Sequence, residues 1–305
     1  DNSSLSPKTV VVTTTDNDSA NFLVSQSTAV VSENGSVSDN FSVVLTSEPT
    51  ANVTLAVSDN DSSEVLFSPT SLVFSKDNWS TVQWITLTGK DDNVSDDNQT
   101  TTLTLSLSSV DSKYDNSSLS PKTVVVTTTD NDTVGWVVSK DNATVSENGT
   151  LSDNFSVVLT SAPTGDVTVS LSDNDTDSSE MSYSPTSLVF GSGNWSVAQW
   201  VTVTGVDDNV SDGSQTILLT LTPSGGDYGG VSAQTLTVTT SDNDTVGLVL
   251  SKSSALVSEN GSVSDNVSVV LSSQPTDNVT LTLSDNDYTE VRVRQAPLTF
   301  SPSYW

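Results

Sequence analysis

The chain is built from copies of one sequence unit, and this repetition constrains its fold more than any other feature. The segment Asp1–Asp18 recurs letter for letter as Asp115–Asp132. The motif VSENG begins at Val31 and returns at Val145 and at Val257. The spacing of 114 and then 112 residues lies far above the roughly 20 to 50 residues of solenoid repeats. Each unit is therefore long enough to form a domain of its own.

The last copy is shorter than the others, because LTFSPSYW at the end of the chain aligns with LVFSKDNW of the first copy. We therefore expect four segments: the final strand and junction of a preceding repeat at 1–18, whole repeats at 19–132 and 133–244, and the first part of an incomplete repeat at 245–305. A chain that opens on one repeat's last strand and closes inside another is typical of a window on a longer array.

Composition excludes several classes of function. Serine and threonine supply 100 of the 305 residues, which indicates a β-rich chain with polar surfaces. There is no cysteine, so no disulfide can form, and no histidine, which removes the usual general base, the Ser-His-Asp triad and the common zinc ligand. The net charge of −29 argues against nucleic acid or an anionic membrane as a partner and favours cations. No apolar run is long enough to span a membrane.

Within each unit, apolar and polar residues alternate with the period of two that predicts β-strands. Turn clusters of Asp, Asn, Ser and Pro separate the runs about every dozen residues. The first repeat has seven predicted strands, the first of them broken: Leu23–Ser32, Phe41–Ser47, Asn52–Ser58, Ser71–Ser75, Val82–Gly89, Thr101–Ser108 and Thr123–Thr129. Seven short antiparallel strands in about 113 residues predict an all-β fold of tandem immunoglobulin-like β-sandwich domains, arranged as beads on a string.

Two tryptophans recur in each whole repeat, in NWSTVQW and NWSVAQW. One interpretation makes them a platform on which sugars stack. The interpretation we favour places Trp84 and Trp200, which fall inside a predicted strand, in the core, and Trp79 and Trp195 against a loop. Large aromatic side chains are needed to fill the core of so polar a chain.

The acidic residues recur in register, as four clusters in each whole repeat. Loops after alternate strands meet at the same end of a sandwich, so the clusters could converge. Asp and Asn also form turns by themselves, but the recurrence favours a bound cation, and Ca²⁺ takes six to eight oxygen ligands with tolerant geometry. The candidate ligands are Glu33, Asp59, Asp91, Asp92, Asp130 and Asp132, then Glu147, Asp173, Asp207, Asp208, Asp242 and Asp244, and Glu259 in the last copy.

The order VSENG, GKDDNVSDDN and a terminal DND resembles the Calx-beta repeat, which is found in sodium–calcium exchangers and in large bacterial surface proteins. The resemblance extends over each whole repeat and implies calcium at the end of the sandwich that faces the next domain. It adds Asp96 and Asp212 to the implied ligands. Gln99 and Gln215 stand where the exchanger-type loop has further Glu residues, which implies fewer or looser ions and a structural clamp in place of a sensor.

The asparagines carry a second signal, because 21 of 23 begin an Asn-x-Ser/Thr triplet without proline at x. This triplet is the acceptor for N-linked glycans. Duplication of turns accounts for part of the excess, but sites private to one repeat also conform. The predicted sites are Asn34, Asn40, Asn52, Asn78, Asn98, Asn116, Asn142, Asn148, Asn154, Asn194, Asn260, Asn266 and Asn278. Triplets inside the proposed metal loops are expected to remain unmodified: Asn17, Asn93, Asn131, Asn209 and Asn243.

These observations favour a structural, non-enzymatic protein outside the cell or on its surface. In this hypothesis the chain is part of a filament, stalk or surface-layer strand that Ca²⁺ stiffens at each junction, and its partners are other copies of itself or neighbouring surface proteins. The alternative is the spacer of a large adhesin whose binding tip lies elsewhere. An enzyme is disfavoured, because no nucleophile and base can be paired without His or Cys.

Overall fold

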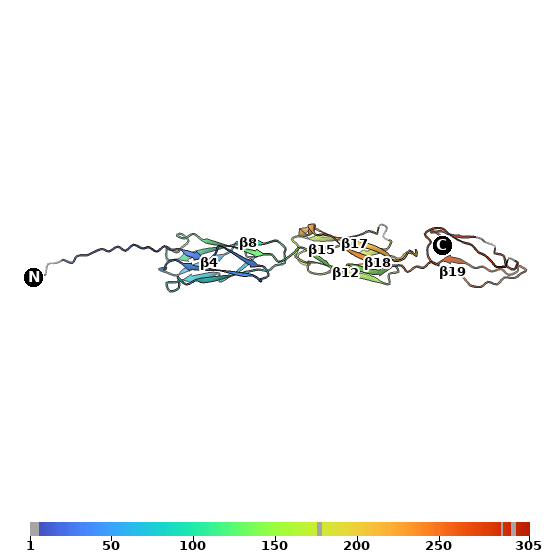
Figure 1. The fold of residues 1–305 in the computed structure, drawn as a ribbon, viewed down its shortest axis with the longest axis horizontal. Coiled ribbons are helices and arrows are strands. Elements are labelled where there is room, and N and C mark those ends of the chain that lie inside the picture. The colour runs from blue at the N-terminus through green and yellow to red at the C-terminus, as the bar shows by residue number, and fades with distance from the viewer. Residues whose placement is uncertain (1–5, 176–178, 288, 294–296) are drawn as a thin grey trace. The chain divides into compact units, whose positions relative to one another are not determined.

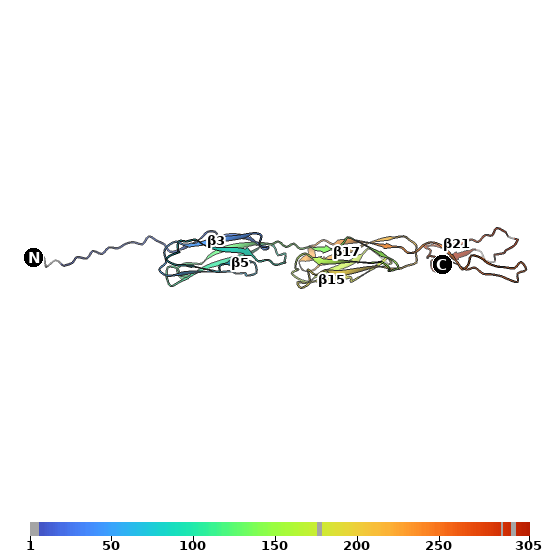
Figure 2. The same ribbon diagram turned by 90° about the horizontal axis from the view of Figure 1, so that it is seen from below.

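The structure is a computed structural model that describes residues 6–175, 179–287, 289–293 and 297–305. The chain divides into two compact units, Asp1–Thr133 and Val134–Trp305. Each unit contains a sandwich of two β-sheets (Figures 1 and 2). The described residues contain no α-helix, and therefore no helix that could cross a membrane.

The sandwich of the first unit is made of nine strands: β1 (Phe22–Val24), β2 (Thr28–Ser32), β3 (Ser38–Leu45), β4 (Val53–Ser58), β5 (Val65–Ser68), β6 (Ser71–Phe74), β7 (Gln83–Gly89), β8 (Gln99–Ser109) and β9 (Lys122–Thr129). One sheet has the order β1-β3-β7-β5, and the other has the order β2-β9-β8-β4-β6. Strands β2 and β9 are parallel neighbours, and the other pairs of this sandwich are antiparallel.

The second unit repeats this sandwich with β10 (Trp136–Val138), β11 (Asn142–Ser146), β12 (Ser152–Leu159), β13 (Val167–Asp173), β14 (Met181–Ser184), β15 (Ser187–Phe190), β16 (Gln199–Gly205), β17 (Gln215–Ser224) and β18 (Gln234–Ser241). A short 3₁₀ helix, η1 (Gly226–Gly230), precedes β18. The sheet orders are β10-β12-β16-β14 and β11-β18-β17-β13-β15, the same as in the first unit. The duplicated sequence therefore gives a duplicated topology.

Alternation along the strands creates each core. In β4 the pattern is strictly buried–exposed over Val53–Ser58, and the inward side chains of both sheets form one apolar cluster around Phe41, Leu55 and Leu105. The equivalent cluster in the second unit surrounds Phe155, Val169 and Leu219. Burial of these side chains drives folding of each sandwich.

The structure confirms the all-β sandwich and corrects the strand count. The broken first strand is two strands, β1 and β2, and these belong to different sheets. Strand β5, with the sequence VLFS, was not predicted, because it is only four residues long and follows a polar turn. The final strand of a preceding repeat, expected within residues 1–18 in the copy of Thr123–Thr129 at Thr9–Thr15, is not formed, since it has no neighbouring strand to pair with. Residues 1–5 of the same segment lie outside the described residues.

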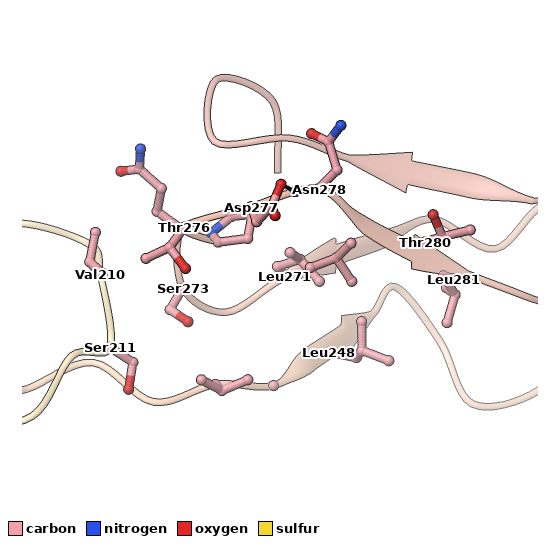
Figure 3. A pocket seen from close by; sticks show the side chains of 15 residues that line it. Val210, Ser211, Leu248, Leu271, Ser273, Thr276, Asp277, Asn278, Thr280 and Leu281 are labelled. Carbon is pink, nitrogen blue, oxygen red and sulfur yellow. Dashed lines mark hydrogen bonds between the residues drawn. The ribbon is translucent and has the colours of Figure 1, made fainter.

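The strands described within residues 245–305 form two pairs: β19 (Leu248–Leu250) with β20 (Val269–Leu271), and β21 (Val279–Leu281) with β22 (Leu298–Phe300). A hollow of about 450 Å³ is open beside these strands and is lined by Leu248, Leu271 and Leu281 (Figure 3). In the two whole sandwiches, the apolar residues at the equivalent positions are buried in the core: Phe22, Leu45 and Leu55 in the first, and Trp136, Leu159 and Val169 in the second. The hollow is therefore the open side of an incomplete core.

The prediction that Trp84 and Trp200 lie in the core is wrong. Their side chains are 56% and 59% exposed, because the inward positions of β7 and β16 belong to their neighbours in the alternation, such as Ile85 and Leu87. Trp79 and Trp195 are half-buried and pack against the cores from their loops, as predicted.

A buried tyrosine fastens the turn that follows the longest strand of each sandwich. The Tyr114 hydroxyl donates to the carbonyl oxygen of Ser47 at 2.7 Å and accepts from the Ser47 amide at 3.0 Å. Tyr228 makes the same two contacts with Ser161, at 2.8 and 3.2 Å. Both phenol rings are almost fully buried. One hydroxyl thus satisfies both backbone groups of a residue that lies in another loop.

We expect Tyr114→Phe to lower the free energy of unfolding of the first unit by about 1–3 kcal/mol, because it leaves two part-buried backbone groups without a partner. Chemical denaturation of the purified chain measures this change. The control is Tyr304→Phe, since the Tyr304 side chain is 76% exposed and should be neutral. Equal stability of the two variants would remove the hydroxyl from the account of the fold.

Candidate metal centre

A close contact between two strand ends builds the site in the first unit. A Cβ atom added at Gly89, the last residue of β7, would lie 2.2 Å from the carbonyl oxygen of Ser32 at the end of β2. Only glycine permits this approach. It brings Asp92, three residues after Gly89, near Glu33, which follows Ser32. Asp91 lies near Asp132. The glycine of the Gly-x-Asp-Asp motif therefore has a steric role.

The end of β9 brings in the remaining acids. The Glu33 amide donates to the Thr129 carbonyl at 3.1 Å, which extends the parallel β2–β9 ladder by one bond. Asp130 and Asp132 follow directly. One carboxylate oxygen from each of Glu33, Asp130 and Asp132 lies within 4.8 Å of the other two. Glu33 thus forms one cluster with two acids that lie about 100 residues later in the chain.

The second unit repeats the cluster with Glu147, Asp242 and Asp244, which meet the same 4.8 Å limit. Gly205 approaches the Ser146 carbonyl as Gly89 approaches that of Ser32, with the same 2.2 Å from a built Cβ. The Glu147 amide donates to the Ser241 carbonyl at 3.2 Å. The geometry is therefore a property of the repeat.

Hydrogen bonds hold the closing acids in place. In Asp130, Oδ1 accepts from the Asp132 amide at 2.7 Å, and Oδ2 accepts from the Asp96 and Asp97 amides at 3.1 and 3.0 Å. Asp97 adopts a left-handed φ of 66°, and its equivalent in the second unit is Gly213, with φ of 82°. This turn of the β7–β8 loop directs backbone amides, and not the Asp96 carboxylate, at Asp130.

The clustered carboxylates repel one another in a partly dry environment. Burial is the main cause that raises the pKa of Glu33 and of Asp132, and nearby acids such as Asp92 raise both further. Burial likewise raises the pKa of Glu147 to about 7, with smaller contributions from Asp242 and Asp208. Asp244 has its pKa raised by the same two causes, burial first. Each site therefore favours added positive charge.

Sequence reasoning missed Glu64 and its equivalent, Glu180. Glu64 is 7% exposed, and its pKa is raised by burial first and then by Asp96, Asp61 and Asp92. The pKa of Glu180 is raised by burial and by Asp212, Asp208 and Asp175. Both residues precede the strand that was not predicted. Their recurrence as SSEV and SSEM was the available signal.

The other predicted ligands differ in their placement. Asp91, Asp92, Asp207 and Asp208 are close enough to raise the pKa values of the triad acids, and Asp96 and Asp212 act instead on Glu64 and Glu180. Burial, and then the neighbouring Asp173, raise the pKa of Tyr183 to about 12. Asp173 is not part of either acid cluster found in the described residues. Asp59 and Glu259 do not join either cluster of acids found in the described residues.

The donor set fits a hard divalent cation. Glu33 Oε2, Asp132 Oδ2, Glu180 Oε2 and Asp244 Oδ2 are buried oxygens without a hydrogen-bond partner. Such atoms are costly unless a cation or a donor satisfies them. The ion pairs in the described part of the chain all lie elsewhere. Oxygen donors alone, several of them charged, match the preference of Ca²⁺.

The structure also divides the predicted glycosylation sites. The side-chain amide nitrogens of Asn78, Asn194 and Asn142 donate hydrogen bonds at 2.8–3.2 Å to nearby oxygens. Asn98 and Asn116 accept backbone amides through Oδ1. By contrast, the side-chain amides of Asn40 and Asn154 make no hydrogen bond within the described residues, although their backbone amides donate to Asp39 and Asp153. Both residues are exposed.

The Calx-beta domain family matches the chain twice, over residues 15–132 and 129–244. The chain therefore belongs to the Calx-beta domain family and carries two such domains in tandem. The two matches overlap over residues 129–132, which include the closing acids Asp130 and Asp132.

Several solved structures are similar to the chain at low identity. The calcium binding domain CBD12 of CALX1.1 is 14% identical, covers 72% of this chain and 99% of its own, and has a TM-score of 0.32. CBD12 from CALX1.2 is 15% identical over 66% of this chain and 80% of its own, with a TM-score of 0.30. Domains 5–6 of the S-layer protein SbsC are 16% identical over 74% and 100%, with a TM-score of 0.25. A comparison with curated protein sequences finds no match.

We expect the metal-free chain to lose stability as the pH rises from about 4.5 to 7. In this window folded Glu147, whose pKa is about 7, holds a proton that the unfolded chain releases near its ordinary pKa of 4.5, so the free energy of unfolding falls with pH by at most about 3 kcal/mol for this residue. Urea denaturation in the presence of a chelator measures the change, and Glu147→Gln should flatten it. A rise in stability across this window would contradict the assignment.

Proposed function

We propose that the chain is a structural segment of an extracellular or surface-attached protein, in which each Calx-beta domain binds Ca²⁺ at the end where the next repeat begins. The observation that carries the proposal is the pair of equivalent acid clusters, Glu33 with Asp130 and Asp132, and Glu147 with Asp242 and Asp244. The first cluster contains two buried carboxylate oxygens that lack a partner, on Glu33 and Asp132, and the second contains one, on Asp244.

The residues would divide the work as follows. Glu33 and Asp132 offer free buried oxygens to the ion, and Asp91 and Asp92 add charge from the β7–β8 loop. Glu64 supplies a further carboxylate from the turn before β5. Asp130 is held by three backbone amides and keeps the closing segment in position. When bound, Ca²⁺ would neutralise these acids and tie three loops together.

A structural role follows from where the closing acids lie in the chain. Asp132 is four residues before Trp136, the first residue of β10. An ion that fixes Asp130 and Asp132 therefore restrains the connection to the following domain. A chain with no cysteine must obtain such restraint from a source other than disulfides.

We also propose that the surface carries N-linked glycans, which supports a location outside the cell. The support is the density of Asn-x-Ser/Thr triplets, together with the exposed side-chain amides of Asn40 and Asn154, which make no hydrogen bond within the described residues. A glycan coat would protect the sheet faces from proteolysis and from edge-to-edge aggregation.

Calcium should raise the melting temperature of the purified chain. At a hundred times the dissociation constant the stabilisation is about 2.7 kcal/mol per site, or roughly 10 °C for a domain of this size. Glu33→Gln should lose the calcium response of the first domain and, because it removes a buried charge, should stabilise the chelated protein.

The matched control for this experiment is Asp77→Asn, because Asp77 is exposed and pairs only with Lys76. It should leave both the response to calcium and the stability in chelator unchanged. Calorimetry with and without chelator measures all three proteins. An identical melting temperature in both conditions for the unmodified chain would remove the metal from the proposal.

Stiffening is a separate expectation, which small-angle X-ray scattering tests. With calcium, the chain should scatter as one extended population of narrow dimension. Chelation should broaden the distribution and lower the radius of gyration, because the connection after Asp132 is released. Asp132→Asn should show the chelated behaviour at the first junction even in calcium. Unchanged scattering alongside a normal calcium-dependent melting shift would retain the ion but reject the stiffening.

A further inference from the structure

The exposed tryptophans occupy an unusual place in the fold. Trp84 lies on β7, an inner strand of the sheet β1-β3-β7-β5, and presents its ring on the outer face. Trp200 has the same position on β16. A large apolar ring in the middle of a polar sheet face is unfavourable in water unless something covers it. Both complete domains keep this arrangement.

The strand register identifies the neighbours of the ring. Ser42 on β3 faces Trp84 directly, and Asn40 faces Thr86. Phe41 and Ile85 fill the alternate positions and are buried, so the other four side chains share the outer face. Asn40 and Trp84 are then diagonal neighbours, at about 7–8 Å between Cα atoms. Asn40, Trp84 and Thr86 line a shallow hollow of about 210 Å³.

These neighbours include a complete glycosylation triplet. Asn40, Phe41 and Ser42 form Asn-x-Ser, and the strand alternation presents both its asparagine and its serine to solvent, beside the indole. The Asn40 backbone N–H donates to Asp39 Oδ1 at 2.7 Å, whereas the Asn40 side-chain amide makes no hydrogen bond within the described residues. Its Nδ2 is therefore free to be modified. The register thus places an unoccupied acceptor next to an uncovered aromatic ring.

The second domain has the same four residues in the same register. Asn154 faces Thr202, and Ser156 faces Trp200. The triplet is again Asn-Phe-Ser, and Asn154 and Thr202 are exposed. The strands differ elsewhere, for example at Ile85, which is Val201 in the second domain.

We propose that Asn40 and Asn154 carry N-linked glycans whose first sugar rings stack on Trp84 and Trp200. This inference rests on the glycan coat of the proposed function and specifies where the coat is held against the protein. The C–H face of a pyranose ring is apolar and weakly positive, and the face of an indole is apolar and negative. Stacking would remove exposed apolar surface from water and fix the glycan along the sheet.

The test uses the whole chain, secreted from a host that performs N-glycosylation. Intact mass is compared with the 31.9 kDa of the bare chain, and glycopeptide mass spectrometry gives the occupancy of each triplet. Hydroxyl-radical oxidation, read peptide by peptide, then reports the exposure of Trp84 and Trp200 in the same molecule.

The informative variant is Ser42→Ala, which destroys the triplet but retains Asn40 and Trp84. The Ser42 hydroxyl makes no hydrogen bond within the described residues, so the sheet should be unaffected. Oxidation of Trp84 should rise about twofold, because a stacked sugar covers one of the two ring faces. Trp200 should be unchanged and serves as the internal control. Ser156→Ala should give the reverse result.

Each failure has a distinct meaning. A bare-chain mass would overturn both the coat and the stacking, while the calcium response would stand. Sugars at other triplets, with Asn40 and Asn154 empty, would overturn only this inference. Occupied sites with unchanged oxidation of Trp84 would reject the stacking. The last outcome concerns external sugars. If Asn40 is empty in the unmodified chain, and added chitotriose protects Trp84 of the Ser42→Ala protein from oxidation, then Trp84 is a platform for external sugars. That result would overturn the assignment to the chain's own glycan.

Discussion

Repulsion between buried carboxylates at one end of each sandwich is the interaction on which the rest of the structure depends. The fold gathers Glu33, Asp130 and Asp132 and leaves oxygens of Glu33 and Asp132 without a donor. The whole chain has 38 acidic and only 9 basic side chains, so few lysines or arginines are present to neutralise these carboxylates. The arrangement is stable only with protons or a metal ion, because a buried charge must be compensated. A need for protons or a cation at this cluster therefore follows from the packing of the strands.

Two features of the backbone bring the acids of this cluster together. One parallel pair, β2 with β9, aligns the start and the end of the domain, and one glycine, Gly89, lets a third strand end approach them. The same residues that close a domain also lead into the next, as the overlapping family matches at 129–132 indicate. One bound ion would consequently both close a domain and restrain the connection to the next domain.

The acid clusters and the exposed tryptophans lie on different parts of each sandwich. The acids lie in the loops at the end of the strands, whereas the tryptophans lie on the outer face of a sheet. Glycans on Asn40 and Asn154 would cover the sheet face. They would not approach the acid clusters, because no residue that lines the hollow beside Asn40 belongs to a cluster. Asparagines that brace turns, such as Asn78, have a structural role that is independent of any sugar.

The sequence by itself determined the repeat, the all-β class, the Calx-beta resemblance and most of the acids, because period-two alternation and motifs in register are local properties. Only the tertiary structure decided which acids meet, since Glu33 joins Asp130 and Asp132 while Asp173 stays outside both clusters of the described residues. It also buried Glu64 near other acids, Asp96 first among them. It also reversed the assignment of Trp84. Alternation says that Trp84 and Ile85 point to opposite faces of the sheet, but only the pairing of β7 with β3 shows that Ile85 faces the core, opposite Phe41. Burial and cross-strand pairing depend on residues far apart in the chain, which no local pattern records.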